Sequence, residues 1–339
     1  MNFVDVFWGK IMAFGIDLRK VHLKPRGKNS KVAYHFRCLM HRLAPLWWLR
    51  HRSKYLINSL DSRSDKDYIL ERVGYYCKIT TETRLDGEYS LISMPKGKSN
   101  YFRDLFEYSR FFDGKLLVDT AFGDNTLVPP TPSILKSRPI GNNNQNCVVC
   151  NLDKVRHFTF LKDKRSFESK SNKAIYRGAS YQPHRVAFME KYFDSDWVDC
   201  GDTSPKPVKP EWGKPLITLY DHLKYKFVIS IEGNDVASNL KWIMSSNSIA
   251  VMPKPKYETW FMEGKLVPNY HYIEIKSDYS DLPERLQYYI DHPEEAKKII
   301  ENAHEYVKQF QDKDREDLIH LLVLRKYFSL TNPDQELMK

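Results

Sequence analysis

The sequence predicts an α/β protein whose second half is Rossmann-like, with a parallel sheet covered by helices. After position 170, short apolar runs alternate with helical segments of about ten residues, which is typical of parallel sheets with helices on both faces. Only 14 glycines occur in 339 residues, which argues against a fibrous or low-complexity chain. The hydrophobic content of 42% suffices for packed cores, and the length suits about two domains.

Before position 170 the pattern is less regular. Residues 66–80 and 100–112 have the apolar spacing of amphipathic helices, whereas 115–123, 146–152 and 157–161 predict short strands. Residues 125–146 hold four prolines and a Gly-Asn-Asn-Asn cluster, and therefore predict a loop. The charged, breaker-rich stretch 162–173 predicts a linker to the second half.

The second half supplies the alternating elements. Each predicted strand is a short apolar run, and each predicted helix has its apolar residues on one side. The strands are expected at 173–176, 196–201, 226–232, 248–253 and 270–276, and the helices at 184–193 and 236–246. Asp281 is expected to cap a further helix, and the chain then reads as helical to near its end, interrupted at Pro293.

The charge distribution points to an acidic partner or surface. The net charge is +10, and eleven Lys or Arg residues with no acid lie between Leu18 and Leu60. Phe36, Trp47, Trp48 and Tyr55 are interleaved with these cations. This segment suits an anionic membrane surface or a phosphorylated glycolipid, nucleic acid, or a plain solvated face. No run of 18 apolar residues predicts a membrane-spanning helix, and the N-terminus lacks the pattern of a secretory signal.

Three possible metal or redox motifs are weak. Cys147 and Cys150 have redox spacing but lie in an apolar run that reads as a buried strand, so structural packing is the preferred interpretation. Asp194-Ser195-Asp196 has the spacing of a metal-binding D-x-D, yet it precedes a strand instead of following one. The eleven histidines show no metal-binding spacing. We therefore expect no metal site.

Phosphate-binding candidates lie at the carboxyl ends of two predicted strands, where ligands bind in open parallel sheets. Gly233-Asn234-Asp235 follows one strand and leads into a helix expected to begin at Val236, with Ala237 and Ser238 in its first turn. Free backbone N–H groups there could hold a diphosphate. Arg177-Gly178-Ala179 follows another strand, and Arg185 on the next helix could join Arg177 in clamping phosphate oxygens.

Asp124 is the candidate general base, because it follows the predicted strand 115–123 directly before a loop. An exposed carboxylate there could accept a proton from a hydroxyl group. An Asx turn that ends the strand is the alternative role, and the residues alone favour it.

Taken together, these motifs resemble glycosyltransferase family 90, which includes protein O-glucosyltransferases and bacterial lipopolysaccharide glycosyltransferases. The similarity covers roughly residues 60 to 310. Its segments are Ile175-Tyr-Arg-Gly-Ala-Ser with Arg185, residues 225–238, Leu266-Val-Pro-Asn-Tyr-His-Tyr, Gly123-Asp124, Lys136-Ser-Arg-Pro-Ile140 and Leu152-Asp-Lys-Val-Arg-His157.

The resemblance implies a GT-B fold, in which two Rossmann-like domains face a cleft, with C-terminal helices. It implies a UDP-sugar donor, inversion at the anomeric carbon, and no metal or other cofactor. By the same resemblance, Asp124 is the expected general base, and Ala179, Arg185 and residues 235–240 are expected to face the UDP-sugar donor. Lys136 and Arg138 are expected on the acceptor side. The expected domains are a basic segment (1–60), an acceptor-side domain (61–170), a donor domain (171–315) and a C-terminal helix (316–339).

One departure concerns Leu240, where the eukaryotic members carry an arginine; Lys241 or Arg177 are the candidate substitutes. A second is the absence of a secretory signal and of an ER-retention end, which moves the expected acceptor from a secreted protein to a lipopolysaccharide or related surface glycan. The enzyme is then expected to be cytoplasmic and peripheral on an anionic membrane. The alternatives, a nucleic-acid-binding protein and a sugar kinase, lack their characteristic motifs, so no nucleic-acid partner is expected.

Overall fold

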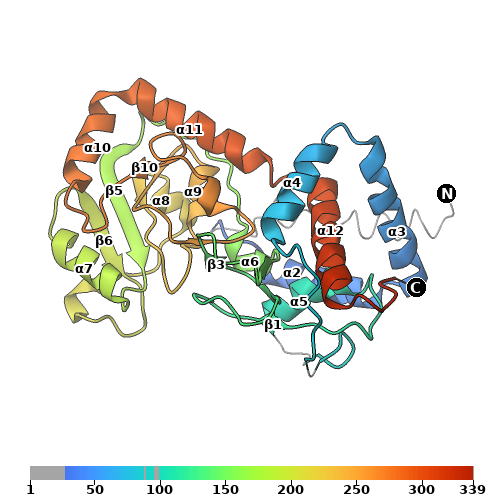
Figure 1. The fold of residues 1–339 in the computed structure, drawn as a ribbon. Helices are drawn as coiled ribbons and strands as arrows, with labels where there is room; N and C mark the ends of the chain where they lie inside the picture. Colours follow the sequence, from blue (N-terminus) through green and yellow to red (C-terminus); the bar gives the residue numbers. More distant parts are fainter. Residues whose placement is uncertain (1–26, 88, 95–98, 339) are drawn as a thin grey trace.

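The computed structural model describes residues 27–87, 89–94 and 99–338 of the chain. They form two lobes that lie side by side (Figure 1). The front lobe holds α2 to α5, a small sheet and the last helix, α12. The back lobe holds a larger sheet with α7, α10 and α11. None of the described helices is long and apolar enough to cross a membrane.

The helices begin and end as follows: α2 Lys31–Leu43, α3 Leu46–Ser59, α4 Lys66–Tyr76, α5 Asn100–Ser109, α6 Lys154–His157, α7 Pro183–Tyr192, α8 Leu219–His222, α9 Leu240–Met244, α10 Leu282–Asp291, α11 Pro293–Lys308 and α12 Lys313–Thr331. The strands are β1 Thr120–Ala121, β2 Ser133–Leu135, β3 Arg138–Pro139, β4 Cys147–Val149, β5 Ser171–Gly178, β6 Val198–Asp202, β7 Tyr225–Ile229, β8 Ile249–Met252, β9 Tyr257–Glu258 and β10 Ile273–Glu274. Short 3-10 turns lie at Leu60–Ser62, Pro210–Trp212 and Glu263–Lys265.

Local chemistry explains several helix starts. Ser30 accepts a hydrogen bond from the Ala33 amide at 3.1 Å, and Asp312 accepts one from the Arg315 amide at 3.1 Å, so each caps its helix. Helices α7, α10 and α11 carry proline in their first turn, where the missing N–H costs nothing. Asp281 precedes α10 as predicted, but its side chain accepts from the Lys276 amide instead of capping the helix.

The back sheet confirms the predicted parallel arrangement. Its strand order is β10-β8-β7-β5-β6, and every neighbouring pair is parallel. Ala174, Phe227 and Ile249 point to the face covered by α7, α10 and α11. Ile175 and Val228 point to the opposite face, which packs toward α9 and the front lobe. Both faces are buried, which is why these strands read as continuous apolar runs.

The front lobe is mainly helical around a small parallel sheet of order β1-β2-β4. The lobes are joined by an antiparallel pair, β3 from the front lobe and β9 from the back lobe. Arg138 lies at this junction, fully buried, and its Nε donates to Glu258 at 2.7 Å. This pair ties the connection between β2 and β4 to the segment after β8.

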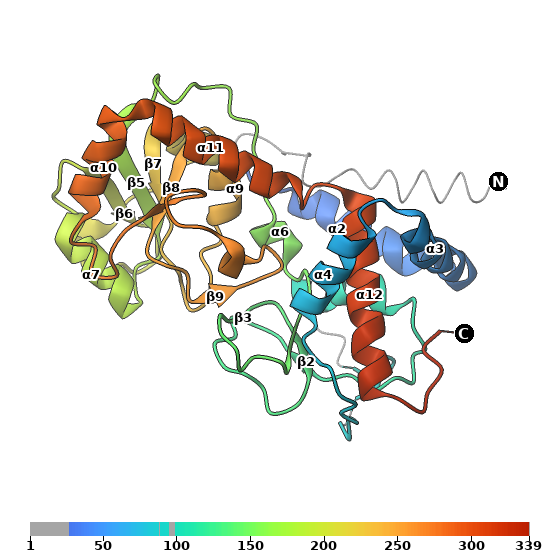
Figure 2. The same ribbon diagram turned by 45° about the horizontal axis from the view of Figure 1, so that its top comes forward.

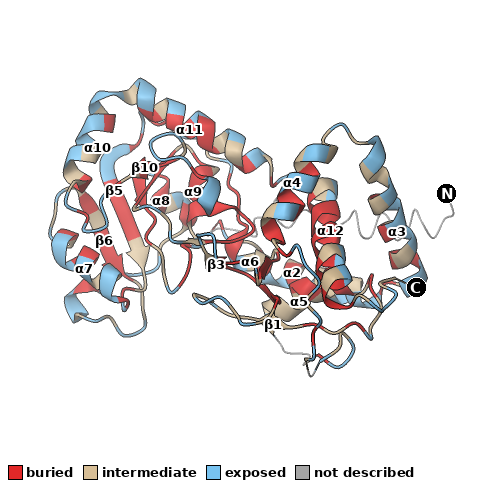
Figure 3. Ribbon diagram, viewed as in Figure 1, coloured by how far each residue is buried: buried red, intermediate tan, exposed pale blue. Residues whose placement is uncertain are grey.

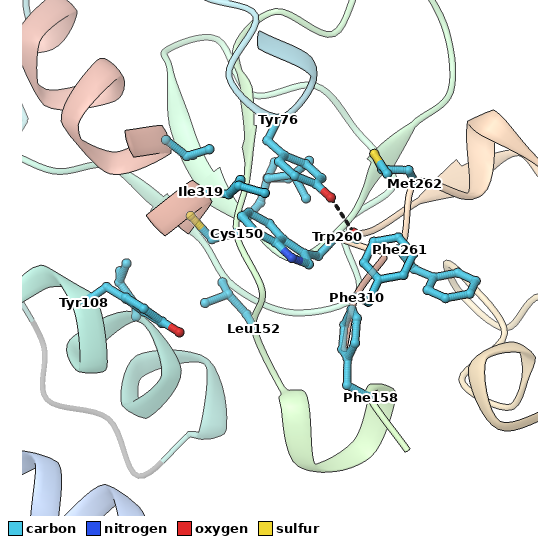
Figure 4. Packing of buried hydrophobic residues seen from close by; sticks show 14 of the residues in the cluster. Tyr76, Tyr108, Cys150, Leu152, Phe158, Trp260, Phe261, Met262, Phe310 and Ile319 are labelled. Carbon is cyan, nitrogen blue, oxygen red and sulfur yellow. Dashed lines mark hydrogen bonds between the residues drawn. The ribbon is translucent and has the colours of Figure 1, made fainter. Parts of the chain in front are cut away.

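One hydrophobic core continues from the front lobe into the back lobe. Tyr76 of α4 stacks on Trp260, with ring centroids 3.9 Å apart, and its hydroxyl donates to the Trp260 carbonyl oxygen at 2.7 Å (Figure 4). Phe261 and Phe310 extend this cluster toward Phe158. The lobes are therefore packed together through apolar side chains as well as joined by the chain.

A buried ion pair lies beside this core. The Arg72 guanidinium binds both carboxylate oxygens of Glu316 on α12, and Trp260 Nε1 donates to Glu316 at 2.6 Å. Arg72 also donates to the Tyr76 hydroxyl at 2.7 Å. These contacts attach the last long helix to α4, so α12 is part of the front lobe although it follows the back lobe in sequence.

Most predicted elements are present, with six corrections. The predicted loop 125–146 contains β2 and β3, and the C-terminal helical stretch is broken at 309–312 as well as before Pro293. The strand predicted at 115–123 is limited to the two residues of β1, and 157–161 ends α6 and continues as a buried loop, not a strand. The helix predicted to begin at Val236 begins at Leu240. The predicted linker packs on the back lobe, where Lys170 and Asp163 form a buried ion pair at 2.5 Å.

Candidate active site

A cleft of about 550 Å³ lies between the lobes, at the carboxyl ends of β5 and β7. Its lining comes from the start of α2, from α6, from α8 and from the turn before α9: Lys28, Asn29, Lys31, Asn100, Asp153, Val155, Arg156, Thr159, Arg177, Leu216, Ile217, Leu219, His222, Val228, Ile229, Ser238, Asn239 and Trp242. The volume suits a small-molecule substrate. Four cations and one carboxylate line the cleft, so an anionic ligand fits it best.

Asp124 stands next to this cleft because of the small parallel sheet. Ala121 of β1 pairs with Leu135 of β2, so the segments after both strands leave the same edge of the sheet. Gly123 has a φ of +118°, which glycine tolerates best, and turns the chain between β1 and Asp124. Asp124 and Lys136 are thereby brought together at neighbouring strand ends.

Lys136 bridges two carboxylates from opposite lobes. Its ammonium lies 2.6 Å from Asp124 Oδ1 and 2.7 Å from Asp235 Oδ2. The hydroxyl of Ser137 also donates to Asp235, at 2.5 Å. The side chains of Lys136 and Asp235 are 1% and 2% exposed, whereas that of Asp124 is 29% exposed. Asp124 is therefore the solvent-facing member of a buried charge bridge.

Arg156 connects Asp124 with the cleft. Its Nη2 lies 3.2 Å from Asp124 Oδ1, and its Nε lies 3.0 Å from Asp153 Oδ2. Its Nε also donates to Nε2 of His157 at 3.1 Å, and burial lowers the pKa of His157 well below its usual range, so this imidazole is a neutral acceptor. Arg156 keeps half of its side chain exposed. It is thus held in position and still open to the cleft.

The electrostatics keep Asp124 ionised. Burial alone would raise its pKa, but the hydrogen bond and charge of Lys136, with those of Arg156, hold the pKa below the ordinary value of 3.8. Both cations contact Oδ1. Oδ2 accepts no hydrogen bond from the residues that the structure describes. An ionised oxygen therefore remains available to a hydroxyl group of a substrate.

The turn after β7 is folded differently from the predicted helix start. Asn239 precedes α9, donates to the Ile229 carbonyl at 3.0 Å and accepts from Ser230 at 2.9 Å. Asp235 is drawn toward Lys136, so 235–239 forms a compact turn. Val236 and Ala237 are buried in this turn, whereas Ser238 is exposed and lines the cleft. Among residues 233–238, which were predicted to bind phosphate, Ser238 is the residue that lines the cleft.

Arg177 and Arg185, which were predicted to clamp phosphate together, lie in different places. Arg177 lines the cleft, but its guanidinium also contacts Asp199 Oδ1 at 2.6 Å and the Asp199 carbonyl at 2.7 Å. Arg185 does not line the cleft. It donates to the carbonyl oxygens of Ala179 at 2.9 Å, Glu232 at 2.8 Å and Ile231 at 2.8 Å. Arg185 therefore holds the ends of β5 and β7 in register.

Glycines allow this close packing of the two strand ends. A Cβ on Gly233 would lie 3.3 Å from Nη2 of Arg185, and a Cβ on Gly178 would lie 3.0 Å from the Tyr176 hydroxyl. The side-chain oxygen of Asn234 accepts from Gln182 at 3.2 Å. The predicted donor residues thus form two groups, one lining the cleft and one bracing the loops behind it.

Other sequence candidates are placed away from the cleft. Arg138 is fully buried against Glu258, and Leu240 is buried in the core. Lys241 is fully buried in an ion pair with Glu263, so it cannot replace the arginine missing at position 240.

The possible metal and redox motifs are also away from the cleft. Cys147 and Cys150 are buried free thiols. Asp194 and Asp196 are exposed before β6, and the described residues contain no cluster of His, Cys, Asp or Glu that could hold a metal ion.

Several cleft residues were not identified from the sequence. Arg156 and Asp153 lie three positions apart in the Leu152–His157 segment, a spacing that can place both on one side of a helical turn. This spacing could have identified Asp153 and Arg156 as a pair from the sequence. Asn100, His222, Trp242 and Asn239 carry no sequence pattern that distinguishes them from core or capping residues.

Comparison with known proteins identifies the class. Glycosyl transferase family 90 matches residues 152–336. The O-glucosyltransferase LpsA of Dichelobacter nodosus is 40% identical over 267 residues, covering 78% of this chain and 84% of that protein. Protein O-glucosyltransferase 3 of Homo sapiens is 27% identical over 168 residues, covering 48% of this chain and 33% of that protein. Protein O-glucosyltransferase 2 of Danio rerio is 31% identical over 140 residues, 39% of this chain and 28% of that protein.

The chain belongs to glycosyltransferase family 90. It is therefore a glycosyltransferase, with a sugar donor and a glycoconjugate acceptor as its substrates. The predicted family and its bacterial lipopolysaccharide branch are confirmed.

The Lys136 bridge generates a stability prediction. Lys136→Met leaves Asp235 buried without its cation, so the free energy of unfolding should fall by about 3–5 kcal/mol, as when one member of a buried ion pair is removed. Chemical denaturation monitored by circular dichroism measures the loss. The matched double variant Lys136→Met/Asp235→Asn removes the stranded charge and should recover part of it. A single variant as stable as the wild type would show that the bridge is unimportant, and equal losses in both variants would show that the unpaired Asp235 charge is not the cause.

Proposed function

We propose that this enzyme is a metal-independent, inverting glycosyltransferase that moves a sugar from a UDP-sugar to a lipopolysaccharide core, O-antigen or related surface glycan. The two lobes are proposed to act as a GT-B pair facing the cleft. The observation that carries the proposal is the position of Asp124, an ionised carboxylate beside a cation-lined cleft of nucleotide-sugar size. The three relatives described above are named O-glucosyltransferases, which favours glucose as the sugar.

The proposed reaction is a single in-line displacement. The acceptor hydroxyl oxygen attacks the anomeric carbon while Asp124 Oδ2 takes its proton. The bond from the anomeric carbon to the β-phosphate oxygen breaks, and UDP leaves with the electron pair from the opposite face. Because the attack comes from the face opposite the leaving group, the anomeric configuration inverts.

The charge that develops on the β-phosphate needs stabilisation, and the cleft supplies cations for it. We assign this role to Arg177, which lines the cleft and would exchange its contact with Asp199 for phosphate oxygens. Ser238 adds a hydroxyl group. A preorganised donor contributes about 3–4 kcal/mol to lowering a barrier, and Arg177 contributes less than this by the free energy needed to release Asp199. Arg156, which bridges the base and the cleft, is the best placed substitute for the arginine missing at position 240.

In this proposal the other residues predicted to bind the donor do not contact it; they hold the loops at the ends of β5 and β7 in place. Arg185 fixes the carbonyl groups at the ends of β5 and β7, and Gly178 and Gly233 let those loops pass close to the side chains around them. Ala179, Asn234, Asp235, Val236 and Ala237 complete the same loops. On the acceptor side, Lys136 orients Asp124, and Arg138 holds the loop that carries Lys136.

The acceptor is proposed to be a glycan carried on a lipid, so the enzyme would work at the cytoplasmic face of an anionic membrane. The acid-free basic segment at 18–60 supports this placement. The similarity to O-glucosyltransferase LpsA over most of both chains supports the lipopolysaccharide acceptor.

Asp124→Asn tests the base. The amide keeps the shape of the carboxylate but cannot accept the proton, so transfer to acceptor should fall by a hundredfold or more, the order of a general-base contribution. UDP should still raise the melting temperature of the variant as it does for the wild type. An Asp124→Asn enzyme with near-normal transfer would exclude Asp124 as the base.

The low pKa of Asp124 predicts the acid side of the pH profile. A group whose pKa is lowered stays ionised until the pH falls to that pKa, so kcat/KM should stay level between about pH 5 and 7 and decline only near or below pH 4. Arg156→Gln removes one of the lowering charges and should move this decline to higher pH. An unchanged position of the decline would show that another group limits the rate.

Treatment with EDTA tests the role of metal. Because the proposed stabilisation comes from guanidinium and hydroxyl groups, the initial rate of UDP-glucose turnover should be the same before and after exhaustive chelation. Activity that is lost with EDTA and restored by Mg²⁺ or Mn²⁺ would refute the metal-independent mechanism.

A further inference from the structure

Helix α2 exposes a continuous row of large apolar side chains. Val32, Phe36, Leu39 and Leu43 are 77%, 62%, 51% and 60% exposed, and their spacing places them along one side of the helix. Leu46 and Trp47, in the first turn of α3, are also exposed. We call these six residues the apolar stripe. Seven of the 20 exposed large hydrophobic residues in the described chain lie between positions 32 and 55, so they are clustered and not scattered.

The stripe cannot turn inward, because the opposite side of α2 is attached to the front lobe. The Tyr34 hydroxyl donates to Asp104 at 3.0 Å, and Arg37 forms an ion pair with Glu107. At the end of the helix, Arg110 donates to the Ala44 carbonyl at 3.0 Å. These partners lie on or next to α5. The orientation of α2 is therefore fixed with its apolar side outward.

The charges around the stripe indicate what covers it. Lys31 and Arg42 are exposed beside the stripe on α2, and Lys54 is exposed on α3. No acidic residue occurs between positions 18 and 60. An amphipathic helix with cations beside an exposed apolar row is the arrangement of a helix that lies in the interface of an anionic bilayer. Trp48, which the sequence suggested as part of this surface, is buried in the core instead.

The same helix reaches the cleft. Lys28, Asn29 and Lys31 at the start of α2 belong to the lining of the cleft, and the 13 residues of α2 extend over about 20 Å at 1.5 Å per residue. Helix α2 starts near α6, between the lobes, and α3 lies at the far end of the front lobe (Figure 2). Exposed positions recur along α3 at this edge of the molecule (Figure 3). The stripe and the cleft entrance are therefore within one helix length of each other.

We propose that the apolar stripe inserts into the surface of an anionic bilayer and holds the cleft at the height of a lipid-linked acceptor. The inference deepens the proposed function and rests on it for the nature of the acceptor. Binding then has two components. The cations bring the enzyme to the surface and are screened by salt, whereas the inserted side chains bind independently of salt.

The test is co-sedimentation of the full chain with vesicles of phosphatidylcholine, with and without phosphatidylglycerol. Phe36→Gln/Leu39→Gln removes two inserted side chains but keeps good helix formers, so partitioning into the anionic vesicles should fall by about a hundredfold. Val208→Gln/Val267→Gln changes two exposed apolar residues of the back lobe and should bind like the wild type. Arg42→Gln/Lys54→Gln should weaken binding at low salt and have little effect at high salt.

Each other outcome overturns the proposal. The stripe is not inserted if the Phe36/Leu39 variant binds vesicles like the wild type, or if the wild type binds none. A large drop in melting temperature or a change of oligomeric state in that variant, without loss of vesicle binding, would show that another part of this chain or a second copy covers the stripe. Thermal stabilisation by UDP, measured on the same samples, tests the glycosyltransferase proposal separately, because it does not depend on the stripe.

Discussion

The ion bridge centred on Lys136 is the constraint on which the candidate active site depends. One buried ammonium group satisfies Asp124 from the front lobe and Asp235 from the back lobe, so a shift of either lobe would leave a charge without its partner inside the protein. The shared core around Tyr76 and Trp260 restrains the same junction. The position of the base relative to the strand ends of the back sheet is thereby determined by contacts that lie outside the cleft.

The cations that hold Asp124 also make it a weaker base. A general base is most effective when its pKa is close to the working pH, whereas Lys136 and Arg156 hold the pKa of Asp124 below the usual range. In the proposed reaction the acceptor hydroxyl becomes acidic only as its oxygen bonds to the anomeric carbon, so a weak but correctly placed base is sufficient. Lys136 and Arg156 therefore hold the Asp124 carboxylate in position at the cost of a lower basicity. They also keep this carboxylate ionised although the leaving group is itself an anion.

The back sheet was predictable from sequence because its strands are short apolar runs separated by turn residues, as in Phe227 to Ile229 and Ile249 to Val251. Asp124 was found through its place in a family motif. The start of α9 was not predictable, because it depends on Lys136 drawing Asp235 across about a hundred positions of sequence. Residues 157–161 have the composition of a strand, yet Phe158 and Phe160 are buried as part of a loop. Contacts between distant residues decided these cases, and local pattern could not reveal them.

The attachment of α12 to the front lobe has a consequence for how the protein is made. The strands of the back sheet, which end with β10 at Glu274, are synthesised before α12, which Arg72 and α4 require as a partner. The back sheet can therefore form first, whereas the front lobe stays incomplete until α12 has left the ribosome. Until then, the apolar surface of α4 and α5 stays uncovered, and the nascent chain is exposed to aggregation and to chaperones in that interval.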